Sequence, residues 1–286
     1  MPSTNPTATF RYVKDPSHYR ALSDTDAHFV LSAELRTPDQ KSRSSNLVFE
    51  YGAPTEIQDM RNSEDDFKLD EHGFQVVRHE WGLDDWTDGT SVEGLYFKEV
   101  EGLVQGVLGE RVRVEIYNWR LRRSGDKGGG CDDGVKYSQP LPTVHIDQTV
   151  KGMVKRVHHH MGSEASGLLK GRVRMINIWR PIINPVTNWP LALCDGSTVS
   201  PTDLVPTDFI TADYVGEMYN VVYRAKHEWY YLSRQRPEEV FLFKIADSKE
   251  DVRARYCPHA SFPQKGIIHG GIPRESIEVR ALVFSE

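Results

Sequence analysis

The sequence predicts a mainly β protein, a sandwich or jelly roll supported by a few helices. Short segments rich in β-branched and aromatic residues are separated by polar turns along most of the 286 residues. Strands and helices do not alternate regularly, and no glycine-rich phosphate loop occurs. A doubly wound nucleotide-binding fold is therefore not expected, and a sandwich or jelly roll fits the pattern better.

A chain of this length is often a single unit when the fold is a barrel or sandwich. We expect one domain over residues 1–286. Residues 1–110 mix helix and strand signals and are expected to form a supporting region. Residues 111–286 are richer in strand signals and are expected to form the β core that carries the functional site.

The supporting region is expected to contain four short strands and one clear helix. The helix is predicted over Gly94–Leu108, because its apolar residues can share one face and Gly109 offers a stop. The strands are predicted at Ala8–Tyr12, Phe29–Ala33, Leu47–Tyr51 and Phe74–His79.

The core begins with Val112–Trp119, where apolar and polar residues alternate as in a half-buried strand. Ser124–Gly134 holds five glycines and three aspartates and is predicted to be a loop. A helix is expected over Lys151–Met161. The remaining predicted strands are Val144–Val150, Gly171–Trp179, Tyr219–Arg224, His227–Ser233, Val240–Ile245 and Ser276–Phe284.

Composition limits the possible partners. The formal net charge is −6, so nothing favours nucleic acid or an anionic membrane as a partner. No apolar run approaches the length that spans a bilayer. The three cysteines fit no metal or disulfide spacing, which indicates a reducing compartment and, by default, the cytoplasm.

His145 and Asp147 carry the clearest chemical signal. Residues two apart in a strand point to the same face, so an imidazole and a carboxylate would converge on one point. A second histidine from a distant strand would complete a set of two histidines and one carboxylate. With open positions left over, that set is diagnostic of iron(II) in oxygen-using enzymes.

The distant histidine has more than one candidate. His158, His159 and His160 are consecutive on a predicted helix, diverge around its axis and are expected on a solvated face. His227 opens a predicted strand and could face a pocket or pack in the core. His259 has small neighbours and is followed by a strand that begins with an arginine.

The final strand supplies candidate anion-binding residues. Arg274, Ser276 and Arg280 share one face of this strand with Glu278. A guanidinium beside a hydroxyl is well shaped to bind a carboxylate through two hydrogen bonds. The alternatives are an arginine paired with Glu278 or an exposed strand face.

Taken together, these motifs resemble the fungal hydroxylase/desaturase family of secondary metabolism, which is similar to the cephem methoxylase. Weaker similarity occurs at Asp59–Arg61 and Gly73–Phe74. The stretches that carry the resemblance run in one order along most of the chain: Asn177–Pro181, Pro190–Asp195, Trp229–Tyr231, Phe243–Lys244, Pro258–Phe262 and Arg274–Arg280.

The resemblance implies a double-stranded β-helix of the jelly-roll or cupin type, with non-haem Fe(2+) held by His145, Asp147 and His259. It also implies that 2-oxoglutarate and oxygen are cosubstrates, with the 2-oxoglutarate carboxylate held by a basic residue of the final strand. Arg274 with Ser276 matches the Arg-X-Ser pattern. Arg274 lies 15 residues after His259, which is a long interval, so Arg280 competes for this role.

Further residues are predicted around the same pocket. Tyr117 and Asn118, on the strand before the glycine-rich loop, could hydrogen-bond the cosubstrate or the substrate. Trp179 and Arg180 could line the pocket, where Arg180 would suit a substrate carboxylate, although Trp179 fits the core equally well. His227 is a further candidate for substrate contact.

The predicted activity is oxidation of an unactivated C–H bond of a small molecule, possibly an amino acid or a derivative, by hydroxylation, desaturation or ring closure. Two other classes remain open: a cupin-like binding protein without redox chemistry, and a zinc hydrolase on the same barrel. No His-Glu-X-X-His motif supports the hydrolase. The sequence does not fix the substrate or the oligomeric state, and a homodimer is one option.

Overall fold

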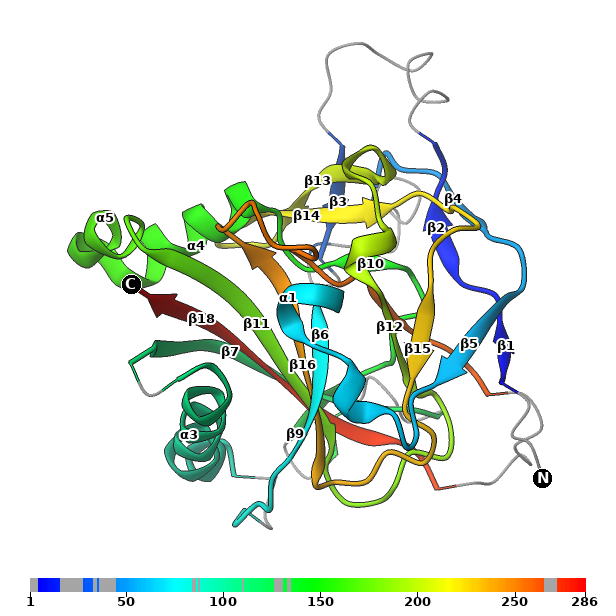
Figure 1. The fold of residues 1–286 in the computed structure, drawn as a ribbon, viewed down its shortest axis with the longest axis horizontal. Coiled ribbons are helices and arrows are strands. Elements are labelled where there is room, and N and C mark those ends of the chain that lie inside the picture. Colours follow the sequence, from blue (N-terminus) through cyan, green and yellow to red (C-terminus); the bar gives the residue numbers. More distant parts are fainter. Residues whose placement is uncertain are drawn as a thin grey trace.

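Two large β-sheets packed face to face form the centre of the molecule (Figure 1). The structure is a computed structural model that describes residues 5–15, 28–32, 35, 45–83, 86, 88–109, 111–125, 131–132, 135–264 and 272–286. The nine-stranded sheet has the spatial order β1 (Thr7–Ala8), β5 (Thr55–Asp59), β15 (Trp229–Tyr231), β12 (Leu191–Cys194), β17 (His259–Ser261), β10 (His145–Ile146), β14 (Val215–Val221), β13 (Leu204–Ile210) and β3 (Phe29–Leu31).

The second sheet has seven strands, and a two-stranded ribbon flanks the first sheet. The seven-stranded order is β6 (Phe74–Arg78), β16 (Glu239–Asp247), β11 (Arg172–Pro181), β18 (Glu275–Ser285), β7 (Arg113–Arg123), β9 (Val135–Ser138) and β8 (Cys131–Asp132). The ribbon pairs β2 (Arg11–Val13) with β4 (Phe49–Tyr51). Strands from both parts of the chain therefore contribute to both large sheets.

The helices are few and lie outside the two sheets. They are α1 (Leu69–His72), α2 (Gly89–Ser91), α3 (Phe97–Leu108), α4 (Val150–Met161) and α5 (Ala165–Leu168), with a π-helical turn over Val92–Tyr96 and 3-10 turns over Glu64–Asp66, Gly162–Glu164, Gly196–Thr198 and Pro201–Asp203. The mainly β jelly-roll prediction is confirmed.

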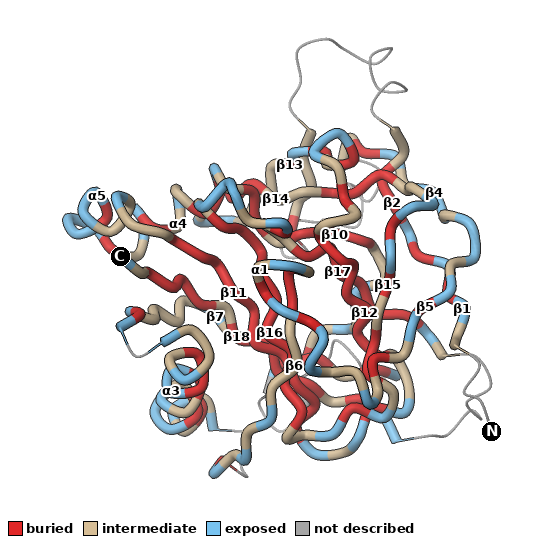
Figure 2. Tube along the Cα trace, viewed as in Figure 1, coloured by how far each residue is buried: buried red, intermediate tan, exposed pale blue. Residues whose placement is uncertain are grey.

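The strands that cross the centre are buried along almost their whole length, as Figure 2 shows. The core between the two sheets includes Ile146, Leu193 and Phe243. In the seven-stranded sheet, the residues that alternate along each strand with these inward-facing ones point to the outer face. They include Ile178 and Leu242 and form a second core there. This alternation is the period of two expected of strands, and burial on both faces explains why the sequence of β16 is a nearly continuous apolar run.

Helix α3 covers the outer face of the seven-stranded sheet. Val100, Leu103 and Val104 lie on one face of this helix and pack into the second core. The prediction of a helix ending at Leu108 is confirmed. Its predicted start at Gly94 is wrong, because the preceding turn, over Val92–Tyr96, is π-helical.

Helix α4 lies beside β14 at the open end of the sandwich. Thr149 caps it by accepting a hydrogen bond from the Gly152 backbone N–H at 2.8 Å. Gly152 permits the close approach, since a Cβ there would lie 2.5 Å from the Glu217 carbonyl oxygen. The predicted helix is confirmed, but the predicted strand Val144–Val150 is wrong beyond Ile146, because the chain turns at Asp147 into this cap.

Most predicted strands of the core are confirmed with shifted ends. Val112–Trp119 extends to Arg123, and Tyr219–Arg224 starts earlier, at Val215, and ends at Val221. The missed strands are short or contain polar residues: β5, β12, β13 and β17. Most of the predicted glycine-rich loop and the end of the predicted strand at Ala33 lie outside the described residues.

We predict that Leu242→Ala lowers the free energy of unfolding by about 2–5 kcal/mol, because it leaves a cavity in the second core, where Leu242 is fully buried. Denaturant unfolding measures the change. Leu95→Ala is the matched control: this side chain is 46% exposed, and its truncation should change stability by no more than about 0.5 kcal/mol. Equal losses in the two variants would contradict the described packing.

Candidate metal centre and its pocket

Two neighbouring strands bring His145, Asp147 and His259 together. β10 and β17 are antiparallel, and His145 lies directly opposite His259. The Nε2 atom of His145 is 3.6 Å from one carboxylate oxygen of Asp147, and the Nε2 atom of His259 is 4.0 Å from the other. The three ligand atoms lie within 4.8 Å of one another, a spacing that one metal ion can bridge.

Backbone carbonyl groups fix the orientation of both rings. The Nδ1 atom of His145 is 2.8 Å from the Thr143 carbonyl oxygen, and that of His259 is 3.1 Å from the Cys257 carbonyl oxygen. A carbonyl oxygen only accepts, so each Nδ1 carries the proton and donates it. Each Nε2 therefore presents its lone pair to the shared point, as metal-binding histidines do.

Burial lowers the pKa of His259 to about 4, and the neighbouring His145 adds to the shift. A neutral imidazole is the form that binds a metal ion. For Asp147, burial opposes ionisation, but Arg280 and the two imidazoles hold the pKa well below its ordinary value. The carboxylate also accepts hydrogen bonds from Asn177 at 2.7 Å and from Arg280 at 3.1 Å.

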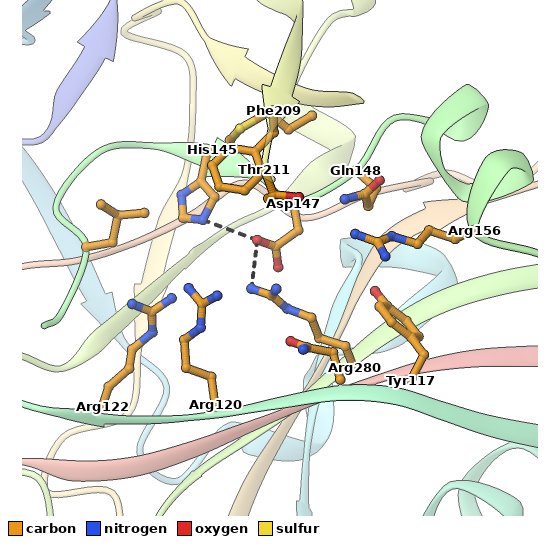
Figure 3. Close-up of a pocket in the computed structure, with 13 residues that line it drawn as sticks. Tyr117, Arg120, Arg122, His145, Asp147, Gln148, Arg156, Phe209, Thr211 and Arg280 are labelled. Carbon is orange, nitrogen blue, oxygen red and sulfur yellow. Dashed lines mark hydrogen bonds and ion pairs between the residues drawn. The ribbon is translucent and has the colours of Figure 1, made fainter. Parts of the chain in front are cut away.

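A cavity of about 250 Å³ opens beside His145 and Asp147 (Figure 3). Four arginines point into it, three from the seven-stranded sheet and one from α4. The full lining consists of Tyr117, Asn118, Arg120, Arg122, Leu141, His145, Asp147, Gln148, Arg156, Phe209, Thr211, Met218 and Arg280. Such a polar, cationic lining beside a histidine–carboxylate set is suited to binding a small polar molecule.

A β-bulge explains why the consecutive residues Tyr117 and Asn118 both line this cavity. Along β18 the partner of Arg280 is Asn118, but the partner of Ala281 is Ile116, so Tyr117 is the extra residue. A bulge changes which residues face which side of a strand. The prediction that both residues border the site is consistent with this placement.

Arg274 and Ser276 lie deeper than this outer cavity. They lie behind a second, narrow cavity, called the inner cavity, whose lining includes Trp179, His259 and Ser261. The guanidinium group of Arg274 donates to Ser261 Oγ at 3.1 Å and to the Trp189 carbonyl at 2.8 Å. Its Nε and second terminal nitrogen, and the Ser276 hydroxyl, have no partner among the described residues although all are buried. Burial lowers the pKa of Arg274 to about 9, with Arg122 adding to the shift.

Trp179 and Arg180 lie on opposite faces of β11, because they are consecutive in a strand. Trp179 lines the inner cavity and also belongs to the core, so its position is consistent with both predictions made for it, a pocket residue and a core residue. Arg180 is buried against Trp81, Trp86 and Tyr96, with its guanidinium carbon 4.5–5.2 Å from the three ring centroids. The structure therefore does not place Arg180 in the pocket.

His227 also lies away from the metal residues. It is buried at the start of the segment leading to β15, and its Nε2 is 3.2 Å from the Asp203 carboxylate. Arg224 and Lys226 contact the same carboxylate. His227 thus belongs to a group of polar side chains around the buried Asp203 carboxylate, and the predicted substrate contact has no support in its position. His269 lies outside the described residues.

Sequence reasoning missed Asn177 and three of the four arginines of the pocket, which are Arg120, Arg122 and Arg156. Asn177 is a fully buried amide within the apolar strand β11, and an isolated polar residue in such a run is the signal that could have identified it. Arg120 and Arg122 share the parity of Asn118 in β7, but they lie beyond Trp119, where the predicted strand ended. Arg156 carries no local signal, because only the packing of α4 against β14 directs it inward.

The fold and the three ligands define a class of protein. The centre of the jelly roll holds two histidines and one carboxylate, which is the ligand set of the non-haem iron(II) oxygenases. An open cavity lies beside these residues, and a buried arginine lies behind them. No described helix is long and apolar enough to cross a membrane.

The similarity of this chain to known proteins supports this class. A family described as oxidoreductase/YMDC permease-like domain matches residues 10–284. The Fe(II)/2-oxoglutarate-dependent dioxygenase nvfI of Aspergillus novofumigatus is 34% identical over 233 residues, covering 79% of this chain and 81% of that protein. The hydroxylase/desaturase efuI of Hormonema carpetanum is 33% identical over 255 residues, covering 82% and 84%.

A solved structure of the iron and alpha-ketoglutarate-dependent endoperoxidase NvfI superposes with a TM-score of 0.83 at 28% identity, covering 99% of this chain and 98% of that one. The chain belongs to the Fe(II)/2-oxoglutarate-dependent dioxygenases of fungal secondary metabolism. The predicted enzyme class and the cofactors iron(II) and 2-oxoglutarate are thereby confirmed, and a small-molecule substrate is consistent with these relatives.

We predict that Arg180→Gln lowers the free energy of unfolding by at least about 2 kcal/mol, because it removes contacts with three aromatic rings and a hydrogen bond to Tyr96. Binding of 2-oxoglutarate to the iron-loaded enzyme should stay within about twofold of wild type. Thermal unfolding and calorimetric titration measure the two quantities. If the variant were as stable as wild type but bound 2-oxoglutarate more weakly, Arg180 would have to lie in the pocket, and the described placement would be contradicted.

Proposed function

We propose that the chain oxidises an unactivated C–H bond of a small molecule at an iron(II) ion held by His145, Asp147 and His259. The carrying observation is the convergence of these three ligand atoms within 4.8 Å beside an open cavity. The residues fit the ion: two imidazoles present Nε2, and one carboxylate is kept ionised. Asn177, which donates to the Asp147 carboxylate, is a positioning residue for that ligand.

Arg274 and Ser276 are the anchor for the distal carboxylate of 2-oxoglutarate in this proposal. Support comes from the two unpartnered nitrogens of the Arg274 guanidinium and the unpartnered Ser276 hydroxyl, which are all buried at the start of β18. A buried cation without a counter-ion is unfavourable, and a carboxylate would satisfy it through charge-assisted hydrogen bonds.

Arg280, the competing candidate, has a different role. Its guanidinium group already contacts the Asp147 carboxylate at 3.1 Å and the Glu278 carboxylate at 2.7 Å. These two carboxylates raise the pKa of Arg280 although burial opposes the charge. Arg280 therefore has no free charge for a cosubstrate and instead orients the metal-binding carboxylate.

When bound, iron(II) with 2-oxoglutarate and oxygen supplies the oxidising power that removes hydrogen from carbon. The chain's own residues bind, orient and exclude water. Trp179 and the core residues around the inner cavity keep water from the cosubstrate site. Tyr117 and Asn118, on the far side of the cavity, are placed to hydrogen-bond a substrate in front of the metal ligands.

The reaction outcome is hydroxylation, desaturation or oxidative ring closure. Relatives are named hydroxylase/desaturase and endoperoxidase, and both names describe oxidations of these kinds. All of them can begin from one metal centre, and the position of the substrate carbon decides among them. An amino acid or an amino-acid derivative is one substrate class that fits a small polar cavity.

We also propose that residues 1–286 form one oxygenase unit, because strands from residues 1–110 and 111–286 pair within both large sheets. A cytoplasmic location is supported by Cys194 and Cys257, which are free thiols. A homodimer stays a prediction, to be decided by light scattering of the purified protein.

We predict that His145→Ala, Asp147→Ala and His259→Ala each reduce succinate formation to below about 1% of wild type, because each removes a ligand of the metal ion. Under anaerobic conditions, iron(II) and 2-oxoglutarate should give wild type a visible charge-transfer band that the variants lack. His158→Ala on the exposed face of α4 is the matched control and should retain both. Normal turnover in any of the three variants would refute the ligand assignment.

We predict that Arg274→Gln raises the KM for 2-oxoglutarate by about 100-fold, and Ser276→Ala by about tenfold, from the loss of charge-assisted hydrogen bonds. Arg280→Gln should instead weaken iron binding, because Asp147 loses its contact with the guanidinium group. Steady-state kinetics and iron titration separate the two effects. An unchanged KM in Arg274→Gln, with a large increase in Arg280→Gln, would reverse the assignment.

A further inference from the structure

The pocket concentrates positive charge in a chain whose net charge is −6. Arg120, Arg122 and Arg280 come from the seven-stranded sheet, and Arg156 comes from α4 on the other side (Figure 3). The two carboxylates nearest to them are Asp147 and Glu278. The balance between these groups determines what the cavity can bind.

Both carboxylates already form ion pairs with the same arginine, Arg280. The same terminal nitrogen of Arg280 lies 3.1 Å from Asp147 Oδ1 and 2.7 Å from Glu278 Oε1. In addition, Asp147 is the proposed metal ligand, so its charge is shared with the ion. The other three arginines of the pocket have no ion pair with any residue that the structure describes.

These three arginines are held in different ways. Arg122 is buried and donates to the Gln139 carbonyl at 2.8 Å. Arg156 stacks on Tyr214, with its guanidinium carbon 3.8 Å from the ring centroid, and its buried Nε has no partner among the described residues. Arg120 has no hydrogen bond or ion pair within the described residues, and its side chain is exposed toward the cavity.

Arg120 also stands beside like charges. In Figure 3 its guanidinium group lies next to that of Arg122 and points toward His145 and Asp147. The surrounding protein removes water from the Arg120 guanidinium group and so lowers its pKa, and the positive charges of Arg280 and Arg122 lower it further. Guanidinium groups that repel one another across a solvated pocket are stabilised when an anion enters between them.

The cosubstrate does not account for this charge if the proposed function holds. The proposed function assigns the distal carboxylate of 2-oxoglutarate to Arg274 and Ser276, behind the inner cavity. Arg120 lines the outer cavity and not the inner one. Arg122 lines both cavities, whereas Arg120 and Arg156 line the outer one alone, so their positive charge faces the space in which the second substrate must sit.

We propose that the substrate oxidised by this enzyme is a small anion, in the simplest case a carboxylic acid, whose carboxylate is bound by Arg120 within the positive field of Arg122 and Arg156. This inference rests on the proposed oxygenase function and adds the substrate class to it. The planar guanidinium fork of Arg120 matches a carboxylate, and the metal ligands lie directly across the cavity. The cavity, at about 250 Å³, favours a molecule below drug size.

The test uses the enzyme loaded with iron(II) and 2-oxoglutarate without oxygen, so that the cosubstrate site is filled. Short-chain mono- and dicarboxylic acids and N-acyl amino acids are titrated by calorimetry, each beside its neutral primary amide. We expect at least one acid to bind about 10-fold or more tightly than its amide. With oxygen admitted, the same acid should stimulate succinate release.

Arg120→Gln should abolish the preference for the acid over the amide while the charge-transfer band and the KM for 2-oxoglutarate stay within about twofold of wild type. Arg120→Lys should retain part of the preference, since it keeps the charge but loses the fork. Arg113→Gln is the matched control: Arg113 lies on the same strand but pairs with Glu164 on the surface, and its loss should change neither quantity.

Each outcome decides the question. The inference is overturned if no acid binds wild type more tightly than its amide, or if the preference survives in Arg120→Gln. A rise in the KM for 2-oxoglutarate in Arg120→Gln would also overturn it, because Arg120 would then serve the cosubstrate. Failure of the proposed function looks different: wild type would show no charge-transfer band with iron(II) and 2-oxoglutarate.

Discussion

The pairing of β10 with β17 is the constraint on which the site depends. It places His145 opposite His259, and their rings face the same side with centroids 4.4 Å apart. A shift of one residue would bring Ala260 opposite His145 and turn the His259 ring toward the outer core, where Ala260 now lies. The hydrophobic packing of both faces of this sheet therefore fixes the register, and through it the spacing of the metal ligands.

The same period of two explains which site residues could be predicted from the sequence. His145 and Asp147, and likewise Arg274 and Ser276, are two apart, so the alternation of a strand predicted that each pair would point the same way, although Asp147 and Arg274 lie just outside β10 and β18. Arg180 was misplaced because it was grouped with its neighbour Trp179, although consecutive residues face opposite sides. Finding His259 required the order of several motifs, since no local pattern indicates that two segments more than 100 residues apart pair.

Other site residues depend on tertiary structure that a linear pattern does not contain. Tyr117 and Asn118 both face the cavity only because of a bulge opposite Arg280, and a regular alternation would have turned one of them away. Arg156 reaches the cavity only because α4 packs closely against β14 at Gly152. Bulges and helix docking are set by packing between distant segments. Arg156 could therefore be placed only from the structure, and strand alternation alone does not explain why both Tyr117 and Asn118 border the cavity.

The buried Lys244, away from the site, is paired with acidic side chains, since it contacts both Asp70 and Asp247. Around the candidate metal centre the charges are instead arranged to receive ligands. An anaerobic crystal structure with iron(II) and 2-oxoglutarate tests this account most directly. It should show one iron ion bound by both Nε2 atoms and the Asp147 carboxylate, with the far carboxylate of 2-oxoglutarate on Arg274. An iron ion bound elsewhere, or that carboxylate on Arg280 or Arg120, would contradict it.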